Sequence, residues 1–335
     1  MAVSTSRNTT EPSGHGLGSV ARKFRSLSRE ARRTIVSLGF LILLYVAIGL
    51  ANPVAFSPKN LSAMAQSGAV LLLVALGGTF VVMMGMIDLS IGSLVTLSGM
   101  SLAVLYQFVG DLAIPLAIII TVFVGLINGA LVAFLRLPSF LVTLGTLSII
   151  AGIALVVGSS YVSLHSSTLD FISLQRPAGI PIALAWAAIL VLILSWVALN
   201  TVFGRSAYAI GGNERVSLIA GTPVKRYKIV AFGLSALTAS VAGIMLVGQL
   251  GAGSPTIGQN FLLDAVASIA VGGTALTGGL GGPWATAIGA AIMTVVSNGL
   301  VVLAVDANTQ GIVKGLIVIV AVYFTMDRKR GLIVK

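Results

Sequence analysis

The sequence predicts an all-α polytopic membrane protein, and three observations support this fold class. Charged residues make up only 9% of the 335 residues, and apolar residues make up 57%. The mean hydropathy is +1.06, whereas about a quarter of the residues in a soluble domain are charged. The chain also contains 39 glycines, and small residues let membrane helices pack closely. These observations exclude an ordinary soluble domain and favour one membrane unit over several independent domains.

The apolar runs predict the membrane-spanning helices. A spanning helix takes roughly 20 apolar residues, so about ten helices fit into this chain. We expect them at 35–51, 62–86, 91–109, 112–135, 138–158, 181–203, 228–250, 261–276, 284–305 and 310–326. Ten spans divide into two sets of five, and an odd number of spans inverts the second set. The count therefore predicts two inverted-topology halves with a solute route near their pseudo-two-fold axis.

The positions of the basic residues predict the orientation. The net charge of the chain is +11. The basic residues cluster before the first apolar run, in the loop 204–227 and at the end of the chain. Such clusters are typical of cytoplasmic segments beside anionic lipid. We therefore expect membrane lipid, not nucleic acid, as their partner. Both termini and the loop 204–227 are expected in the cytoplasm, with Asp111, Asp170 and Asp306 outside.

These positions also divide the chain into parts. Residues 1–33 are predicted to be a polar basic cytoplasmic tail, and residues 34–327 the transmembrane domain. The loop 204–227 belongs to that domain, and residues 328–335 form a second cytoplasmic tail.

A polar segment separates the second and third apolar runs. It contains Asp88, Ser90, Gly92 and Ser93. An ionisable or irregular segment at membrane depth is tolerated only where it is buried in protein or lines a wet cavity. In one interpretation Asp88 lines a solute route or gate, and the two serines offer hydroxyls to the solute. In the other, Asp88 or Ser90 is the N-cap of a helix that starts near Ile91, and Gly92 permits close packing. The two interpretations are compatible.

A second polar group lies near residue 264. Asp264 is expected in the first turn of a helix, where a carboxylate is favoured by the helix dipole, and it is also a candidate for the route. Gly272 and Gly273 open a run of six glycines that ends at Gly282. An ordinary continuous helix is improbable there, so we expect a tight inner turn or a re-entrant break.

The loop 204–227 predicts a short helix on the cytoplasmic face. Gly212 ends one helix, Asn213 is a good N-cap and Glu214 suits the positive end of the next helix. Gly221 and Pro223 then give a C-terminal stop. A helix of about two turns is too short to be stable alone. It can serve as a knob for a groove on a partner protein, or it can rest on lipid headgroups.

Several kinds of chemistry are missing from the sequence. There is no G-x-x-x-x-G-K-[ST] sequence, so we expect no P-loop nucleotide site in this chain. The only histidines are His15 and His165, and there are no cysteines. This composition gives no zinc cluster and no histidine-based catalytic pair. We expect neither a catalytic residue nor a metal or cofactor in this chain.

Three blocks of the sequence resemble the ribose-type (monosaccharide) permeases of bacterial ABC importers, whose superfamily also includes branched-chain amino acid permeases. The blocks are 85–93, with Gly-Met-Ile-Asp-Leu-Ser-Ile-Gly-Ser, 209–221, with Ala-Ile-Gly-Gly-Asn-Glu and then Ala-Gly, and 271–282, with Val-Gly-Gly-Thr-Ala-Leu and then Gly-Gly-Leu-Gly-Gly. They keep the family's order and approximate spacing, and the resemblance runs from about residue 35 to residue 326.

The resemblance implies a multi-pass subunit of the bacterial inner membrane that forms a permease homodimer. Its partners would be an ABC ATPase subunit, which carries the ATP and Mg²⁺, and a periplasmic substrate-binding protein. The short helix would be the coupling helix that docks in the ATPase. It departs from the acidic–Ala–Ala pattern of other importers, because Arg215 and Val216 follow Glu214. The implied coupling residues are Gly212, Asn213, Glu214, Arg215, Ala220 and Gly221. The candidates for the translocation path or gate are Asp88, Ser90, Gly92, Ser93, Asp264, Gly272 and Gly273.

Alternative functions also remain open. Permeases for branched-chain amino acids or nucleosides are related to the ribose type. A stand-alone secondary transporter would need a titratable centre near the midplane, and only Asp88 and Asp264 qualify. A membrane enzyme lacks support in the sequence.

Overall fold

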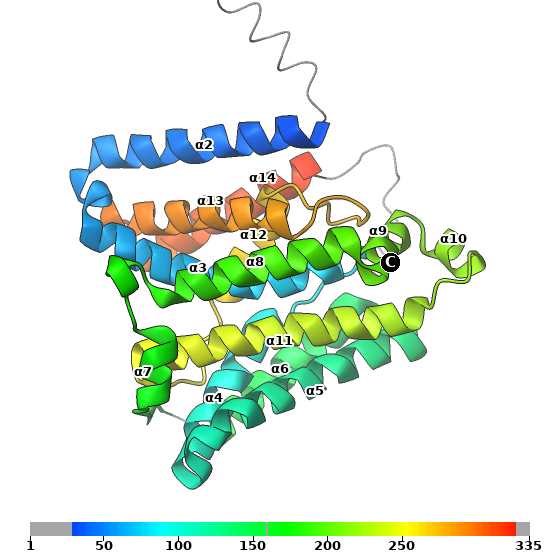
Figure 1. The fold of residues 1–335 in the computed structure, drawn as a ribbon, viewed down its shortest axis with the longest axis horizontal. Coiled ribbons are helices and arrows are strands. Elements are labelled where there is room, and N and C mark those ends of the chain that lie inside the picture. The colour runs from blue at the N-terminus through cyan, green and yellow to red at the C-terminus, as the bar shows by residue number, and fades with distance from the viewer. Residues whose placement is uncertain (1–28, 159, 326–335) are drawn as a thin grey trace, which may run out of the picture.

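The computed structural model describes residues 29–158 and 160–325, and these residues form a layered bundle of helices (Figure 1). The elements in chain order are α2 (Arg29–Ala51), η1 (Pro53–Phe56), α3 (Pro58–Met83), α4 (Ile91–Val109), η2 (Gly110–Leu112), α5 (Ala113–Phe134), α6 (Ser139–Val157), β1 (Val162–Ser163), α7 (Ser167–Ser173), η3 (Pro177–Gly179), α8 (Ile182–Asn200), α9 (Val202–Gly212), α10 (Glu214–Ile219), α11 (Val224–Leu250), β2 (Ala252–Gly253), α12 (Phe261–Val271), α13 (Pro283–Val302) and α14 (Ala307–Thr325). Residues 1–28 of the predicted tail 1–33, and the whole of the predicted tail 328–335, lie outside the described residues.

The predicted fold class of an all-α polytopic membrane protein is confirmed. Within the described residues, seven helical segments are long and apolar enough to cross a membrane, and one of them covers both α4 and α5. The segments α12 and α14 contain shorter apolar stretches. The expected span 261–276 is shorter in the structure, because α12 ends at Val271 and the glycine run follows. Its 11 residues rise about 16 Å, roughly half of the hydrocarbon core.

The helices α3 and α11 lie at the centre of the bundle. They pack against each other, and α3 also contacts α8, α12 and α13. The side chains of Leu76, Phe80 and Phe232 are fully buried between these helices. Gly77 permits the close approach, because a Cβ atom at this position would lie 2.0 Å from Oγ1 of Thr238.

The outer helices expose apolar side chains over long faces. Phe123 on α5, Leu192 on α8 and Ile312 on α14 have exposed fractions of 63%, 64% and 72%. Such faces are stable where lipid, not water, surrounds the helices.

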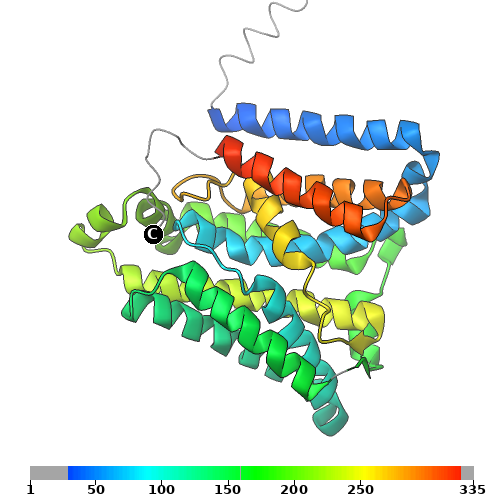
Figure 2. The same ribbon diagram turned by 180° about the vertical axis from the view of Figure 1, so that it is seen from behind.

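The connections divide between the two ends of the bundle (Figures 1 and 2). At one end lie α10, the glycine run and the turn between α5 and α6. At the other end lie α7 and η1, and there Asp111 accepts hydrogen bonds from Ser166 and Thr168. Both α2 and α14 direct the end nearest a chain terminus toward the α10 end. The ends of α2 and α14 that lead to the predicted cytoplasmic tails therefore lie at the same end of the bundle as the loop 204–227.

Candidate functional site

The short helix predicted in the loop 204–227 is α10. Asn213 has an extended conformation, and its side-chain oxygen accepts a hydrogen bond from the backbone N–H of Val216 over 3.1 Å. Gly221 ends the turn with a φ of +80°, a conformation that glycine adopts without steric cost. Ile219 is 81% exposed and Val216 58%. The helix therefore presents apolar side chains away from the bundle.

An ion pair fixes the start of α10 to α11. Nζ of Lys228 lies 2.7 Å from Oε1 of Glu214, and both side chains are partly buried. Sequence reasoning identified Glu214 but not Lys228, although the basic run after Pro223 was the available signal. The ion pair joins a helix of six residues to the long central helix α11.

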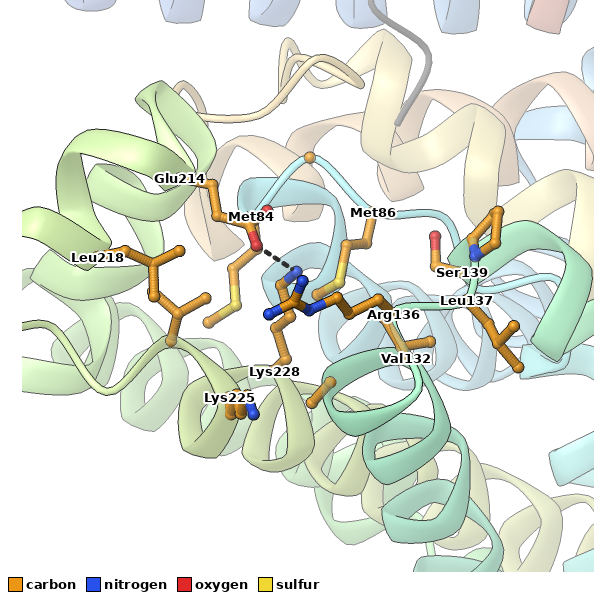
Figure 3. A pocket seen from close by; sticks show the side chains of 14 residues that line it. Met84, Met86, Val132, Arg136, Leu137, Ser139, Glu214, Leu218, Lys225 and Lys228 are labelled. Atoms are coloured by element: carbon orange, nitrogen blue, oxygen red, sulfur yellow. Dashed lines mark hydrogen bonds and ion pairs between the residues drawn. The ribbon is translucent and has the colours of Figure 1, made fainter.

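A pocket of about 550 Å³ lies beside this ion pair (Figure 3). Its wall combines the start of α10 and α11 with the segment after α3 and the turn before α6. Its lining residues include Met84, Met86, Arg136, Leu218 and Lys225. The pocket therefore borders four separate segments of the fold at the α10 end.

The glycine run, residues 272–282, packs against the end of α9. The backbone N–H of Gly279 donates to the carbonyl oxygen of Met83 over 2.9 Å, and the hydroxyl of Tyr208 donates to the carbonyl oxygen of Gly281 over 2.7 Å. Gly211 fits between these segments, since a Cβ there would lie 1.9 Å from the Met83 oxygen. As expected, the run is not a continuous helix, and Gly272 and Gly273 begin it where α12 ends.

Asp88 is buried in protein, with an exposed fraction of 2%. Its Oδ1 accepts the backbone N–H of Ser90 over 2.9 Å and the hydroxyl of Ser90 over 2.5 Å. Its Oδ2 accepts the hydroxyl of Ser235 on α11 over 2.8 Å. The helix α4 begins at Ile91, and Ser90 makes no side-chain cap. Asp88 therefore closes the turn before α4 and joins it to α11.

A chain of hydrogen bonds extends from Ser90 to α6. The Asn128 amide on α5 donates to Oγ of Ser90 over 3.2 Å, and its Oδ1 accepts the hydroxyl of Thr146 over 2.6 Å. Ser93 instead donates to the carbonyl oxygen of Ser90. Because sequence reasoning considered each polar residue separately, it did not predict this four-segment network.

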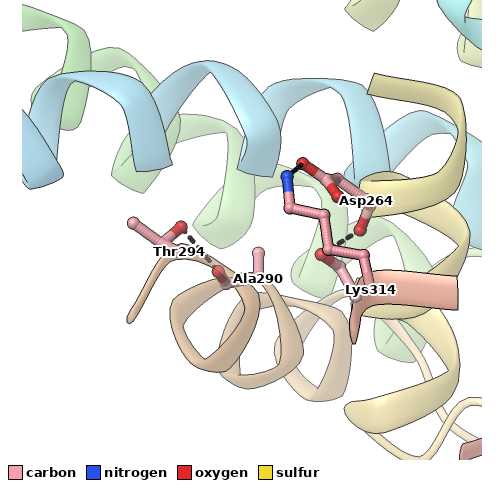
Figure 4. Close-up of polar contacts among 5 residues, drawn as sticks. Asp264, Ala290, Thr294 and Lys314 are labelled. Atoms are coloured by element: carbon pink, nitrogen blue, oxygen red, sulfur yellow. Dashed lines mark hydrogen bonds and ion pairs between the residues drawn. The ribbon is translucent and has the colours of Figure 1, made fainter. Parts of the chain in front are cut away.

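Asp264 and Lys314 form an ion pair between α12 and α14 (Figure 4). Nζ of Lys314 lies 2.7 Å from Oδ2 of Asp264, and the side chains are 17% and 13% exposed. The carbonyl oxygen of Asp264 accepts the hydroxyl of Ser268. Asp264 lies in the first turn of α12, as the sequence predicted. The sequence did not predict its pairing with Lys314, because the two residues are 50 positions apart.

The starts of α4 and α12 meet inside the bundle. A Cβ on Gly92 would lie 2.7 Å from the carbonyl oxygen of Gly258, and one on Gly258 would lie 1.9 Å from that of Gly92. The N–H of Gly258 also donates to the hydroxyl oxygen of Thr96. The two polar groups predicted at Asp88 and Asp264 thus stand near the start of two touching helices. Within the described residues, no group of three or more metal-ligating side chains forms.

Comparison with known proteins defines the class of this chain. Residues 60–322 match the family described as branched-chain amino acid transport system / permease component. The chain therefore belongs to this family of permeases and is a transport subunit. No solved structure matches the chain.

Curated relatives narrow the class to ABC permeases of the ribose type. The ribose import permease RbsC of Bacillus subtilis is 36% identical over 298 residues, covering 87% of this chain and 91% of the relative. RbsC of Escherichia coli K12 is 34% identical over 306 residues, covering 88% and 93%. The D-allose permease AlsC of the same strain is 33% identical over 296 residues, covering 86% and 90%.

Family membership establishes the cellular location of the protein and the kinds of protein it works with. The chain is a multi-pass protein of the bacterial inner membrane. The family implies an ATPase subunit and a substrate-binding protein as its partners.

Proposed function

We propose that this chain passes a small sugar, a ribose- or xylose-like monosaccharide, from a periplasmic binding protein across the inner membrane. The observation that carries this proposal is the similarity to ribose and D-allose import permeases over most of both chains. The family description favours branched-chain amino acids as a second candidate substrate. Nucleosides remain a further alternative.

We infer about ten membrane passages in two inverted halves, with both termini in the cytoplasm. The helices α4 and α12 have matching neighbours: α4 packs on α5, α6 and α11, and α12 packs on α13, α14 and α3. Asn128-Gly129 is also the sixteenth and seventeenth residue pair of α5, as Asn298-Gly299 is of α13. These equivalences support a repeat in which the four helices α3–α6 correspond to the four helices α11–α14. The helices α2 and α8 lie outside the repeat.

We propose that α10 is the coupling helix. Its exposed apolar side chains suit a groove on an ATPase, and the Glu214–Lys228 ion pair connects it to α11. Gly212, Asn213, Arg215, Ala220 and Gly221 form or flank this helix. ATP and Mg²⁺ would bind the ATPase, so this chain would need no cofactor or catalytic residue.

The mechanism follows from these connections. Closure of two ATPases would move the α10 helices of a permease homodimer, and α11 would transmit this movement to Ser235 and Asp88. The route would then open alternately outward and inward. Since the binding protein supplies affinity, the route itself needs only weak polar contacts.

ATP dependence tests this function directly. The permease, its ATPase and its binding protein are reconstituted in vesicles with radiolabelled D-ribose. We expect uptake to stop when ATP is removed while the proton gradient is maintained. Uptake by the permease alone, driven by a proton or sodium gradient, would instead show a secondary transporter.

The binding protein identifies the substrate. We expect titration calorimetry of the binding protein encoded beside this permease to give heat with a pentose. Binding of leucine but no sugar would favour the amino acid alternative.

A further inference from the structure

Asp264 and Lys314 lie well within the membrane-spanning bundle. Lys314 is the eighth of the 19 residues of α14, so it lies near the middle of that helix. Asp264 is the fourth residue of α12, and the backbone of Leu262 in the same turn lies against Gly92 of α4. Ionisable residues at such depth mark substrate or ion pathways by default, because they are costly in lipid.

The two carboxylate oxygens of Asp264 have different surroundings. Oδ2 receives the ammonium of Lys314. Oδ1 is buried, and within the described residues no group donates a hydrogen bond to it. A buried acceptor without a donor is destabilising, and Asp264 as a whole is only 9% exposed. Asp264 therefore offers an acceptor that the described residues leave without a donor.

A buried ion pair such as Asp264–Lys314 is weak evidence for a stabilising function. Replacing a buried ion pair with apolar residues of similar size is often neutral or stabilising. Yet both side chains keep some exposure, 13% for Asp264 and 17% for Lys314, so the pair is not sealed inside the helix packing. An acceptor and a cationic donor side by side can hydrogen-bond two neighbouring hydroxyls of one solute.

We propose that Asp264 and Lys314 contact the transported solute by hydrogen bonds to two of its hydroxyls. When the route opens, Oδ1 of Asp264, which is buried in the conformation that the structure shows, accepts a hydroxyl hydrogen of the solute, and Nζ of Lys314 donates to an oxygen of the neighbouring hydroxyl. This inference rests on the proposed transport function and adds the groups that line its route. The pair keeps its charges throughout, and no covalent step is involved.

The first experiment compares conservative variants that keep both charges. Asp264→Glu and Lys314→Arg retain an ion pair, and assembly with the ATPase should therefore be preserved, but the acceptor and the donor move. Uptake of D-ribose is measured at saturating, loaded binding protein, so that affinity for the binding protein does not limit the rate. We expect uptake to fall about tenfold. Normal uptake by both variants overturns the proposal.

Deoxy analogues separate solute contact from a structural function. Ribose and its analogues that lack one hydroxyl are compared in the wild type, Asp264→Asn and Lys314→Met. We expect each variant to lose more uptake for ribose than for the analogue without the contacted hydroxyl. An equal loss for every sugar overturns the proposal and makes the pair structural. Asp306→Asn, outside the spanning helices, is the matched carboxylate control and should leave the sugar preference unchanged.

Charge exchange gives an independent test. The double variant Asp264→Lys with Lys314→Asp restores an ion pair but exchanges the places of acceptor and donor. We expect thermal stability near that of the wild type and low uptake, and full recovery of uptake would overturn the proposal.

The absence of cysteine in this chain adds a chemical test. Lys314→Cys should lose uptake, and 2-aminoethyl methanethiosulfonate should restore it by returning an ammonium group, whereas the methyl reagent should not. Modification no faster than at the fully buried control Ala239→Cys overturns the proposal, because the site would then be closed to solutes. ATP dependence of wild-type uptake is unaffected by any of these results, so a failure here is distinct from failure of the proposed function.

Discussion

At the scale of single residues, hydrogen bonds and glycines determine how polar groups are accommodated in this membrane protein. Asp88 receives three hydrogen bonds and has no cation among the described residues within ion-pair distance. Asp264 instead pairs with the cation Lys314, and the part of the chain that the structure describes provides no donor to its Oδ1. The two carboxylates, which look alike in the sequence, therefore have different surroundings.

Gly258 is expected to tolerate no side chain. A Cβ at this position would lie 1.9 Å from the carbonyl oxygen of Gly92, and backbone cannot move aside as a flexible side chain can. We expect Gly258→Ala to lower the free energy of unfolding by about 1–3 kcal/mol. The measurement is thermal unfolding in detergent. Gly145→Ala, inside α6 and with nothing within 4 Å of the added Cβ, is the control and should not be destabilised, because alanine favours a helix more than glycine does.

Asp306 gives a pH dependence. The hydrogen bonds from the side chain and the backbone N–H of Thr309 hold the pKa of Asp306 below its usual value. A lowered pKa in the folded state stabilises the protein above the unfolded pKa, about 3.9, and this contribution is lost as the pH falls through the folded value. We expect the melting-temperature difference between the wild type and Asp306→Asn to shrink below about pH 4. A constant difference would contradict this prediction.

At the scale of elements, α10 is defined by local signals and α12 by tertiary packing. The Asn213 cap and the Gly221 stop are readable in the sequence, and the structure has a helix between them. The end of α12 was misplaced by five residues, because the apolar run continues to Leu276 while Gly272 contacts α13. A Cβ there would lie 2.2 Å from the Ala285 oxygen. Hydropathy contains no information on such a contact.

Disruption of α10 should uncouple transport. We expect Val216→Pro, which removes the N–H that Asn213 caps, and Glu214→Lys, which reverses one partner of the ion pair, to abolish uptake and binding of the ATPase. The melting temperature of the membrane domain should stay near that of the wild type, because α10 contributes little to the core. Val202→Ala, an exposed position at the start of α9, is the control. Wild-type uptake in both variants would remove the coupling function from this helix.

At the scale of the whole molecule, the all-α membrane fold class could be predicted from composition and hydropathy, whereas seven helical segments of the described residues are long and apolar enough to span a membrane and α12 and α14 contain only shorter apolar stretches. The sequence could not predict which residues of the candidate site contact one another. The Asp264–Lys314 pair, the Asn128 network and the contact of Gly92 with Gly258 all join residues far apart in the chain. A single sequence gives the polar residues but not their distances, so it could not show which carboxylate has a cation.

Orientation is testable with single cysteines, since the chain has none. We expect Ile219→Cys on α10 to react with a membrane-impermeant maleimide only in inside-out vesicles. Thr168→Cys on α7, at the opposite end of the bundle, should react only in intact, right-side-out spheroplasts. Reaction of both residues from one side would refute the proposed topology.

The contact between Gly92 and Gly258 has a mechanical consequence. Gly92 lies in α4, and Gly258 lies in the turn before α12. Two segments that touch backbone to backbone at one place can tilt about it, but they cannot be pushed closer together there. The contact is then a fulcrum: a push on α11 from the α10 end would reappear, reversed, at the far end of α4. A short stroke at one face of the bilayer would thereby become an opening at the other.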